Sequence, residues 1–182
     1  MAEYSDNELL KMFREGSNPN YAFNLIVQKY RERIYWHIRK IVIVHDDADD
    51  VMQNAFVKIW KGLPDFREES QLYTWIYRIA TNEAITHLNQ QRRRFFLPIA
   101  DVENKLSNTL ETDPWFNGDE LQKKLQKAVL KLPEKQRIVF NMKYFDEMKY
   151  EDMSEILETS VGALKASFHL AVKKIEKYLE DH

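Results

Sequence analysis

Apolar residues recur along most of the chain at the three- and four-residue spacing of an α-helix, and no segment shows the strict alternation of a strand. One apolar stripe runs over residues 21–40. A second runs over 48–60 and ends where Gly62-Leu63-Pro64 breaks the pattern. A short polar loop, 65–71, then leads into a third predicted helix over about 72–94. The pattern therefore predicts an all-α fold.

A change in composition divides the chain into two parts. Residues 95–118 contain two prolines, a glycine and four acidic residues without a sustained helical period, which predicts a flexible linker. The helices predicted after this linker cover 121–131, 133–145, 150–157 and 161–179. The expected organisation is two small helical domains, 1–94 and 119–182, joined by the linker 95–118.

Composition narrows the class of protein. The 182 residues include 44% hydrophobic residues, which is typical of a globular chain, and no cysteine, which excludes disulfides, thiolate zinc sites and a cysteine nucleophile. The polar N-terminus and the short longest aliphatic run, Ile41–Val44, predict a cytoplasmic protein without a secretory signal or a membrane span. The net charge is −2, with 14 basic and 13 acidic residues in 1–94 and 12 of each in 119–182. Contact with DNA would therefore use small local patches and help from a larger partner.

The acidic cluster His45-Asp46-Asp47-Ala48-Asp49-Asp50 allows more than one interpretation. His45-Asp46 is the dipeptide of metal-dependent phosphohydrolases, although no supporting set of ligands stands out. A calcium-binding loop is excluded, because it would have no glycine at its sixth position and Val57 at its twelfth. The structural alternative is that Asp46 and Asp47 cap and charge the first turn of the next helix.

A polar stripe follows on the predicted helix, formed by Asp50, Asn54, Lys58 and Lys61 on the face opposite the apolar stripe. Such a stripe is either an ordinary solvated face or, beside a partly exposed Phe56, a surface that docks on another protein.

Aromatic and arginine side chains are interleaved over 66–78, and Arg92-Arg93-Arg94 follow on the same predicted helix. Single-stranded nucleic acid needs this mixture, because flat rings stack on exposed bases and cations bind phosphate. The alternative is that Trp75, Ile76 and Ile79 are core residues and that the three arginines form a solvated helix end.

Two helices joined by the turn Glu158-Thr159-Ser160 close the chain. This arrangement matches a helix-turn-helix, whose second helix enters the major groove. Ala163 and Ala166 on the outer face of that helix would allow close approach to base edges. The alternative is an αα-hairpin used only for packing.

Taken in order, these features resemble a bacterial sigma factor of the extracytoplasmic-function type, in the sigma-70 family. Residues 47–60, from Asp-Ala-Asp-Asp to Lys-Ile-Trp, look like the family's helix that binds core RNA polymerase. Phe66-Arg67-Glu68-Glu69-Ser70 with residues 74–82 is similar to its promoter-melting segment. Leu132-Pro133-Glu134-Lys135-Gln136-Arg137 with residues 161–165 resembles its domain for the upstream promoter element. The likeness covers about 5–94 and 119–180.

The resemblance implies a division of labour between three sets of residues. The set that would dock on the clamp helices of the largest polymerase subunit is Asp49, Asp50, Gln53, Asn54 and Phe56. The set that would capture and open the −10 promoter element is Phe66, Arg67, Glu68, Ser70, Gln71, Tyr73, Arg78, Asn82, Arg92 and Arg93. The set that would read the −35 element is Ser160, Ala163, Lys165, Ala166, Ser167, His169, Lys173 and Lys174.

The last helix departs from the family pattern. Ser167 and Leu170 stand where members often have arginine, and Glu158 stands where they often have glycine. Bidentate reading of guanine is therefore not expected. The lysines of this set, with His169, are expected to contact phosphate instead.

The resemblance also implies partners. The chain would not be an enzyme and would need no cofactor and no metal. Its expected partners are core RNA polymerase, through the clamp helices and the flap of the second-largest subunit, and promoter DNA; an anti-sigma factor is left open. Two other functions remain as alternatives: a stand-alone regulator that binds duplex DNA, and a metal phosphohydrolase centred on His45-Asp46.

Overall fold

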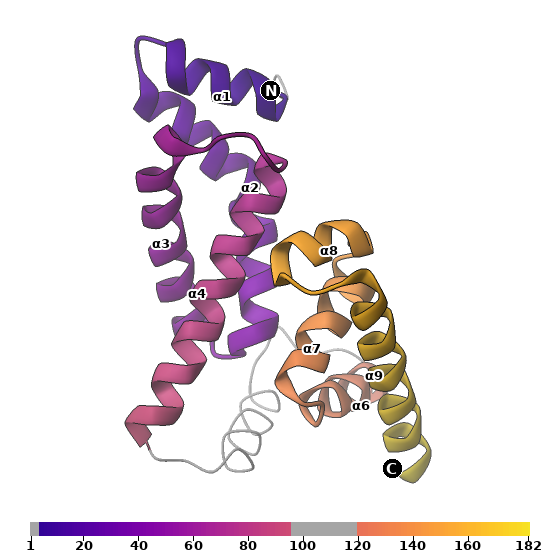
Figure 1. Ribbon diagram of the computed structural model, residues 1–182. Helices are drawn as coiled ribbons and strands as arrows, with labels where there is room; N and C mark the ends of the chain where they lie inside the picture. Colours follow the sequence, from indigo (N-terminus) through magenta and orange to yellow (C-terminus); the bar gives the residue numbers. More distant parts are fainter. Residues whose placement is uncertain (1–3, 96–119) are drawn as a thin grey trace.

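Every regular element in residues 4–95 and 120–182, the part of the chain that the computed structural model describes, is helical (Figure 1). The predicted all-α fold is confirmed. The predicted linker, 95–118, lies outside the described residues except for the helix end at Phe95. In chain order the elements are α1 (Asp6–Glu15), α2 (Pro19–Val42), α3 (His45–Gly62), η1 (Leu63–Asp65), α4 (Leu72–Phe95), α6 (Glu120–Leu130), α7 (Glu134–Phe140), η3 (Asn141–Phe145), α8 (Tyr150–Leu157) and α9 (Val161–Asp181).

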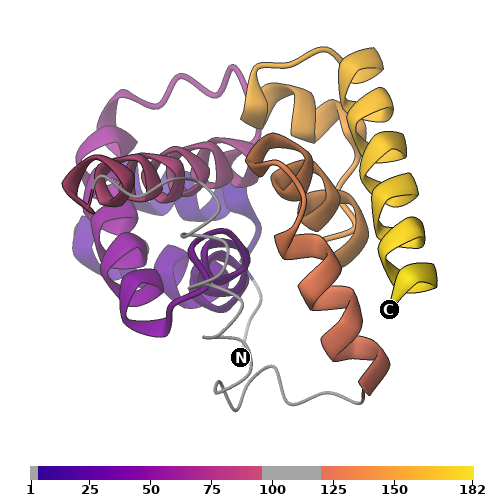
Figure 2. The same cartoon turned by 90° about the horizontal axis from the view of Figure 1, so that it is seen from below.

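The helices form two groups that lie side by side (Figure 2). In the first group α2, α3 and α4 pack along one another, and α1 lies across one end of α2. The aliphatic stripes that predicted these helices form their shared core, where Ile26, Ile34, Ile38, Ala55 and Ile59 are all 0% exposed. Among the described residues, no helix has the length and apolar character needed to cross a membrane.

Hydrophobic spacing alone did not predict α1, although its start carries a recognisable signal. The Ser5 side chain accepts a hydrogen bond from the Glu8 backbone N–H, and the Glu8 carboxylate accepts one from the Ser5 backbone N–H. The hydrogen bonds from the Ser5 side chain and backbone lower the pKa of Glu8 below its ordinary value. Leu9, Leu10 and Phe13 follow at helical spacing and are buried.

The start of α3 differs from the expectation that Asp46 and Asp47 cap it. Val44 is the N-cap residue and no side chain caps the helix there, so that expectation is wrong. Both acids do lie in the first turn, where the helix dipole favours negative charge. Asp47 instead ties α3 to α4, because its carboxylate lies 3.3 Å from His87 and accepts a hydrogen bond of 2.9 Å from Gln91.

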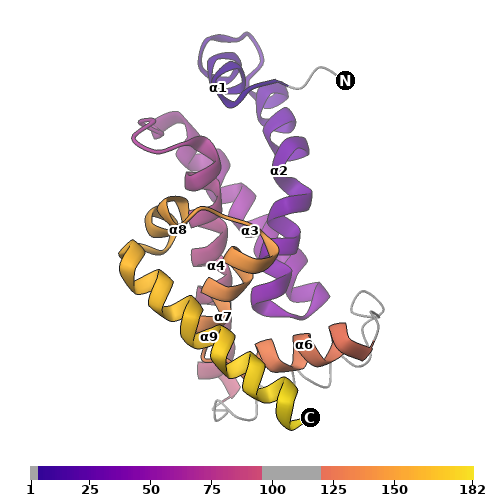
Figure 3. The ribbon, with the colours of Figure 1, turned by 90° about the vertical axis from the view of Figure 1, so that its right-hand side faces the viewer.

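The second group consists of α6, α7, η3, α8 and α9, with α9 on its outer side, which faces the viewer in Figure 3. Glu158 turns the chain between α8 and α9 in the left-handed conformation, with φ of 50°. Ser160 then caps α9 by accepting a hydrogen bond from the Ala163 backbone N–H. Glycine adopts the left-handed conformation without cost and glutamate does not, yet the departure at Glu158 leaves the predicted helix-turn-helix intact.

A shared buried core joins the two groups. Met142 of η3 and Met153 and Ile156 of α8 belong to the same buried cluster as the α2 isoleucines. The π-helical turn η3 brings Asn141 to α2, where its side chain donates a hydrogen bond of 3.2 Å to the Lys40 carbonyl oxygen. The two groups therefore pack through apolar and polar contacts together.

Candidate nucleic-acid interface

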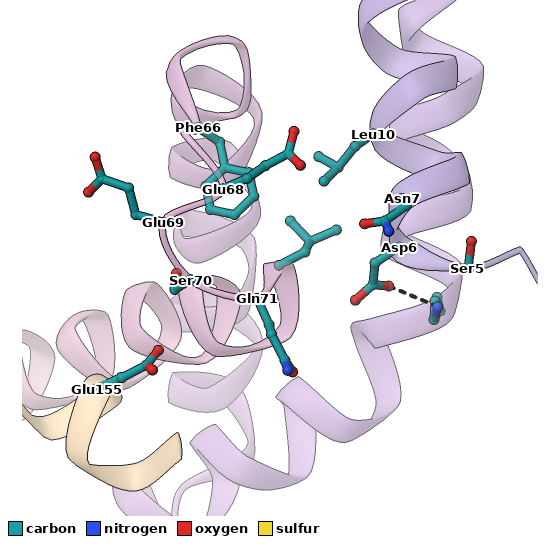
Figure 4. Close-up of a pocket in the computed structure, with 12 residues that line it drawn as sticks. Ser5, Asp6, Asn7, Leu10, Phe66, Glu68, Glu69, Ser70, Gln71 and Glu155 are labelled. Carbon is teal, nitrogen blue, oxygen red and sulfur yellow. Dashed lines mark hydrogen bonds and ion pairs between the residues drawn. The ribbon is translucent and has the colours of Figure 1, made fainter. Parts of the chain in front are cut away.

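The loop between η1 and α4 forms one wall of an open pocket of about 740 Å³ (Figure 4). The first turns of α1 form the opposite wall, where Asn7 and Leu10 face the loop. Amides, hydroxyls and carboxylates line most of the pocket: Ser5, Asp6, Asn7, Glu68, Glu69, Ser70, Gln71 and Glu155. Such groups can hydrogen-bond the edges of a base. The glutamates of the lining disfavour a phosphate, and the cation in the lining, Lys29, is paired with Asp6.

The loop is supported from below and from the side. The Phe66 ring is 7% exposed and packs on Trp75, with ring centroids 4.9 Å apart. Gly62 permits this packing, because a Cβ atom there would meet the Trp75 ring at 3.0 Å. Arg14 of α1 donates hydrogen bonds to the Glu68 carboxylate and to the Phe66 carbonyl oxygen. Packing covers most of the Phe66 ring, but Phe66 is also one of the residues that line the pocket, and its expected contact with DNA stays a prediction.

The remaining residues expected at the −10 element lie in the loop or along α4. Those with exposed side chains are Arg67, Glu68, Gln71, Asn82 and Arg93, and those that are half-buried are Ser70, Tyr73, Arg78 and Arg92. The Arg33 guanidinium of α2 lies 5.5 Å from the Tyr73 ring centre. Burial raises the pKa of Tyr73 to about 12, so its phenol keeps its proton near neutral pH and can donate a hydrogen bond.

The residues expected at the −35 element lie on one solvent-facing side of α9. Its buried side, which includes Leu164, Ala171 and Ile175, fixes the helix against the rest of its group. The expected residues Ser160, Ala163, Lys165, Ala166, His169, Lys173 and Lys174 are exposed, and Ser167 is half-buried. A single helix therefore brings this whole set together.

The residues expected to dock on polymerase lie on α3. Asp50, Gln53 and Asn54 are exposed, Asp49 is half-buried, and Phe56 packs against the core. Asp49 also lines a groove of about 520 Å³ between α2 and α3. The α2 side of that groove was not predicted: Gln28, Arg31, Glu32, Tyr35 and Trp36. Their signal in the sequence is a polar and aromatic face at helical spacing beside the apolar stripe of α2.

His45 is held by neighbours that leave no sign of a metal site. Its Nδ1 atom lies 2.7 Å from the Tyr35 hydroxyl, and its Nε2 atom lies 3.6 Å from the Asp49 carboxylate. Within 4–95 and 120–182, no three histidine or acidic side chains are placed to hold a metal ion together. The phosphohydrolase alternative gains no support from these residues.

Comparison with known proteins gives two family matches, in the order of the two helical groups. Sigma-70 region 2 matches residues 26–94, and Sigma-70, region 4, matches residues 122–175. The RNA polymerase sigma-H factor of Pseudomonas aeruginosa is 30% identical to the chain over 190 residues, which covers 99% of this chain and 96% of that protein. The chain belongs to the sigma-70 family.

Other relatives place this sigma factor in the extracytoplasmic-function (ECF) group. The ECF RNA polymerase sigma factor SigW of Bacillus subtilis is 29% identical over 180 residues, covering 94% of this chain and 95% of that protein. The sigma factor RpoE of Bartonella quintana, solved in complex with the anti-sigma factor NepR, has a similar fold, with a TM-score of 0.68 at 19% identity over 87% of this chain and 96% of that chain. The protein is an alternative sigma factor, which binds core RNA polymerase and directs it to promoter DNA without being an enzyme itself.

Acidic side chains of region 4 meet cations of region 2 in this sigma factor. Glu134 at the start of α7 pairs with Arg92 of α4. Asp146 pairs with Lys40, and its carboxylate lies 3.2 Å from the Nδ1 atom of the buried His37. Burial alone would raise the pKa of Asp146, but the hydrogen bond from His37 and the positive charges of His37 and Lys40 outweigh burial and hold the pKa below its ordinary value. Region 4 therefore covers part of the surface expected to meet the −10 element.

Proposed function

We propose that this sigma factor divides promoter recognition between its two regions. Residues 1–94 act on polymerase and the −10 element, residues 119–182 act on the −35 element, and residues 95–118 connect them through the polymerase cleft. The observation that carries the proposal is the polar pocket beside the loop 66–71, because a concave pocket accepts a base only after that base has left the duplex stack. A convex, exposed helix such as α9 suits the major groove of an intact duplex instead.

For polymerase, the proposed docking surface is the exposed face of α3. Asp49, Asp50, Gln53 and Asn54 meet the clamp helices of the largest subunit, and Phe56 supports that face from the core side. The groove between α2 and α3 continues this surface, since Asp49 belongs to both. Region 4 contacts the flap of the second-largest subunit.

At the −10 element, the loop 66–71 receives one unstacked base of the opened strand. Ser70 and Gln71 offer hydrogen bonds to its edge, and Tyr73 lies at the start of α4 next to them. Arg67, Arg78, Asn82, Arg92 and Arg93 contact the sugar-phosphate backbone. Phe66 and Glu68 shape the loop.

The free energy needed to open a promoter explains why such a protein depends on polymerase. Opening about ten base pairs costs on the order of 14 kcal/mol, at about 1.4 kcal/mol per stacked step. Stacking of a captured base returns about 1–3 kcal/mol. One or two captured bases therefore cannot hold a bubble open, although they can select where polymerase opens one.

At the −35 element, α9 lies in the major groove. Ala163, Ala166 and Ser167 face base edges, where an alanine methyl can contact the methyl group of thymine. Ser160, Lys165, His169, Lys173 and Lys174 hold the phosphates. Specificity then rests on shape and apolar contact more than on arginine hydrogen bonds.

The place of action and one further partner follow from the family. Because RNA polymerase works in the cytoplasm, the protein acts there as well. An anti-sigma factor is a proposed regulatory partner, since the similar RpoE structure is a complex with one.

Run-off transcription tests the proposed function. Purified core polymerase is incubated with genomic promoter fragments, with and without this protein. We expect specific start sites only in its presence. Transcripts that do not depend on the protein, together with no comigration of the protein on core polymerase, would refute the proposal.

A second experiment tests the docking surface separately. The double change Asp50→Ala and Gln53→Ala removes two exposed polar side chains and should weaken core-polymerase binding about tenfold without altering thermal stability. The matched control is Asp181→Ala, an exposed acid at the far end of α9. Unchanged polymerase binding in the double variant would show that this face of α3 is not the docking surface.

A further inference from the structure

Helix α1 precedes the matched part of region 2, which begins at residue 26, yet it supplies a wall of the pocket described above. Its position is fixed by α2. The Asp6 carboxylate accepts hydrogen bonds from the Tyr30 hydroxyl at 2.7 Å and from the Lys29 ammonium at 2.8 Å. Lys29 also donates to the Tyr4 carbonyl oxygen, at 2.9 Å. Leu9 and Leu10 are also buried, so packing as well as these hydrogen bonds anchors α1 against α2.

Arg14, near the end of α1, is the direct link from this wall to the loop 66–71. One guanidinium nitrogen donates to the Glu68 carboxylate and another donates to the Phe66 carbonyl oxygen. The two contacts lie on either side of Arg67, so they hold the loop at two points. They leave the pocket-facing edges of Ser70 and Gln71 available.

The loop needs such a restraint because of its backbone. Glu68 has a φ of 56°, a left-handed conformation that a non-glycine residue keeps only when its surroundings impose it. The Arg14 contact to the Glu68 carboxylate and the buried Phe66 ring are the surroundings that do so.

The Arg14 contact contributes little to the overall stability of the fold. The side chains of Arg14 and Glu68 are 37% and 47% exposed, and ion pairs this exposed add little to the free energy of unfolding. The contact is therefore suited to setting the shape of the loop and not to holding the domain together.

We propose that α1 is a working part of the promoter-opening site and that Arg14 is its positioning residue. Arg14 holds the loop 66–71 in the shape that receives an unstacked base, and Asn7 closes the pocket from the opposite wall. This inference rests on the proposed capture of a −10 base by the loop. A loop that is already ordered avoids the entropy cost of ordering at the moment of capture, so more of the free energy of base binding remains to favour the open promoter.

The test uses holoenzyme and single-stranded oligonucleotides that carry the −10 sequence found by run-off transcription. Each base is replaced in turn by an abasic site, and binding is measured by fluorescence anisotropy. With the wild-type factor, loss of the captured base should weaken binding about fivefold or more. If no abasic site matters to the wild type, the proposed base capture itself fails.

The same series with Arg14→Gln isolates the role of Arg14. We expect the preference for the intact oligonucleotide over the abasic one to fall to about twofold or less, because a disordered loop no longer distinguishes them. Arg14→Lys keeps one charged contact and should restore part of the preference. Core-polymerase binding and the melting temperature should remain within error of the wild type in both variants.

Lys11→Gln is the matched control. Lys11 lies on the same helix, is 74% exposed, pairs with Glu15 at 4.0 Å and does not line the pocket. This substitution should leave the preference for the intact over the abasic oligonucleotide unchanged. A preference fully retained in Arg14→Gln, in holoenzyme whose wild-type form shows it, would overturn the inference while leaving base capture by the loop in place.

Discussion

The two surfaces proposed to meet the promoter are built in opposite ways. The surface on α9 is one face of one helix, and every backbone position that matters comes from a single continuous segment. The −10 surface combines α1, the loop 66–71 and α4 around a pocket, and region 4 contacts this surface through Glu134, which pairs with Arg92, and Glu155, which lines the pocket. Secondary structure alone is enough for the first surface, whereas the second exists only when distant segments are packed together. The two surfaces should therefore respond differently to the same kind of substitution.

The largest difference should come from removing packing. Leu10 is 4% exposed and belongs to the wall of the pocket, so Leu10→Ala should lower the free energy of unfolding by about 2–5 kcal/mol. Leu170→Ala, on α9, should cost less than about 0.5 kcal/mol, because that side chain is 49% exposed. Urea unfolding of both variants checks the comparison. Equal costs would mean that α1 is not integrated into the core.

A smaller change should follow from loosening the contact between the two regions. Asp146→Asn removes the carboxylate that serves both His37, which is 1% exposed, and Lys40. We expect the free energy of unfolding to fall by about 1–3 kcal/mol, because the buried His37 ring then loses its charged acceptor. Urea unfolding gives the free energy, and energy transfer between dyes on α3 and α9 reports whether the regions separate. Unchanged values in both measurements would show that Asp146 does not hold region 4 against region 2.

Acid provides an independent check on that same contact. Because the pKa of Asp146 is lowered in the folded protein, its carboxylate stabilises the fold above its ordinary pKa of 3.8 and loses that effect as pH falls below this value. The difference in stability between the wild type and Asp146→Asn should accordingly be constant near neutral pH and shrink below pH 3.8. A difference that grew on acidification would contradict the assigned direction of the shift.

The smallest effects should come from two serines in equivalent positions. Ser5 caps α1 and Ser160 caps α9, so each change to alanine should cost about 1 kcal/mol of helix stability. Ser5→Ala should weaken single-stranded −10 binding by holoenzyme and spare −35 duplex binding, and Ser160→Ala should do the reverse. If both variants impaired both activities equally, the two surfaces would not be independent.

This contrast also explains how far the sequence could predict the molecule. The helices α2, α3, α4, α8 and α9 were predicted because each buries a stripe that local spacing reveals. The shared face of Ala163, Ala166 and Ser167 on α9 followed from helical spacing, whereas Lys165, His169 and Lys173 were assigned to the −35 element from the family resemblance.

Sequence reasoning failed where distant segments meet. The pairing of Arg14 with Glu68 joins residues 54 positions apart, and no periodicity signals it. The packing of Phe66 on the Trp75 ring is another contact that joins the loop to α4 and that the sequence did not predict. The capping box formed by Ser5 and Glu8 was the one local signal that could have predicted α1, and with it the α1 side of the pocket.

The length of α4 has a consequence for the geometry of the promoter. Tyr73 and Arg92 stand nineteen residues apart on this uninterrupted helix, which at 1.5 Å per residue is about 28 Å. Duplex DNA advances 3.4 Å per base pair, so the same span covers about eight base pairs. If α4 runs along the DNA with Tyr73 beside the captured base, as the proposed function implies, the arginines at its other end would reach the double helix about eight base pairs from that base. In that arrangement the length of α4 would set the distance between the captured base and the arginine contacts.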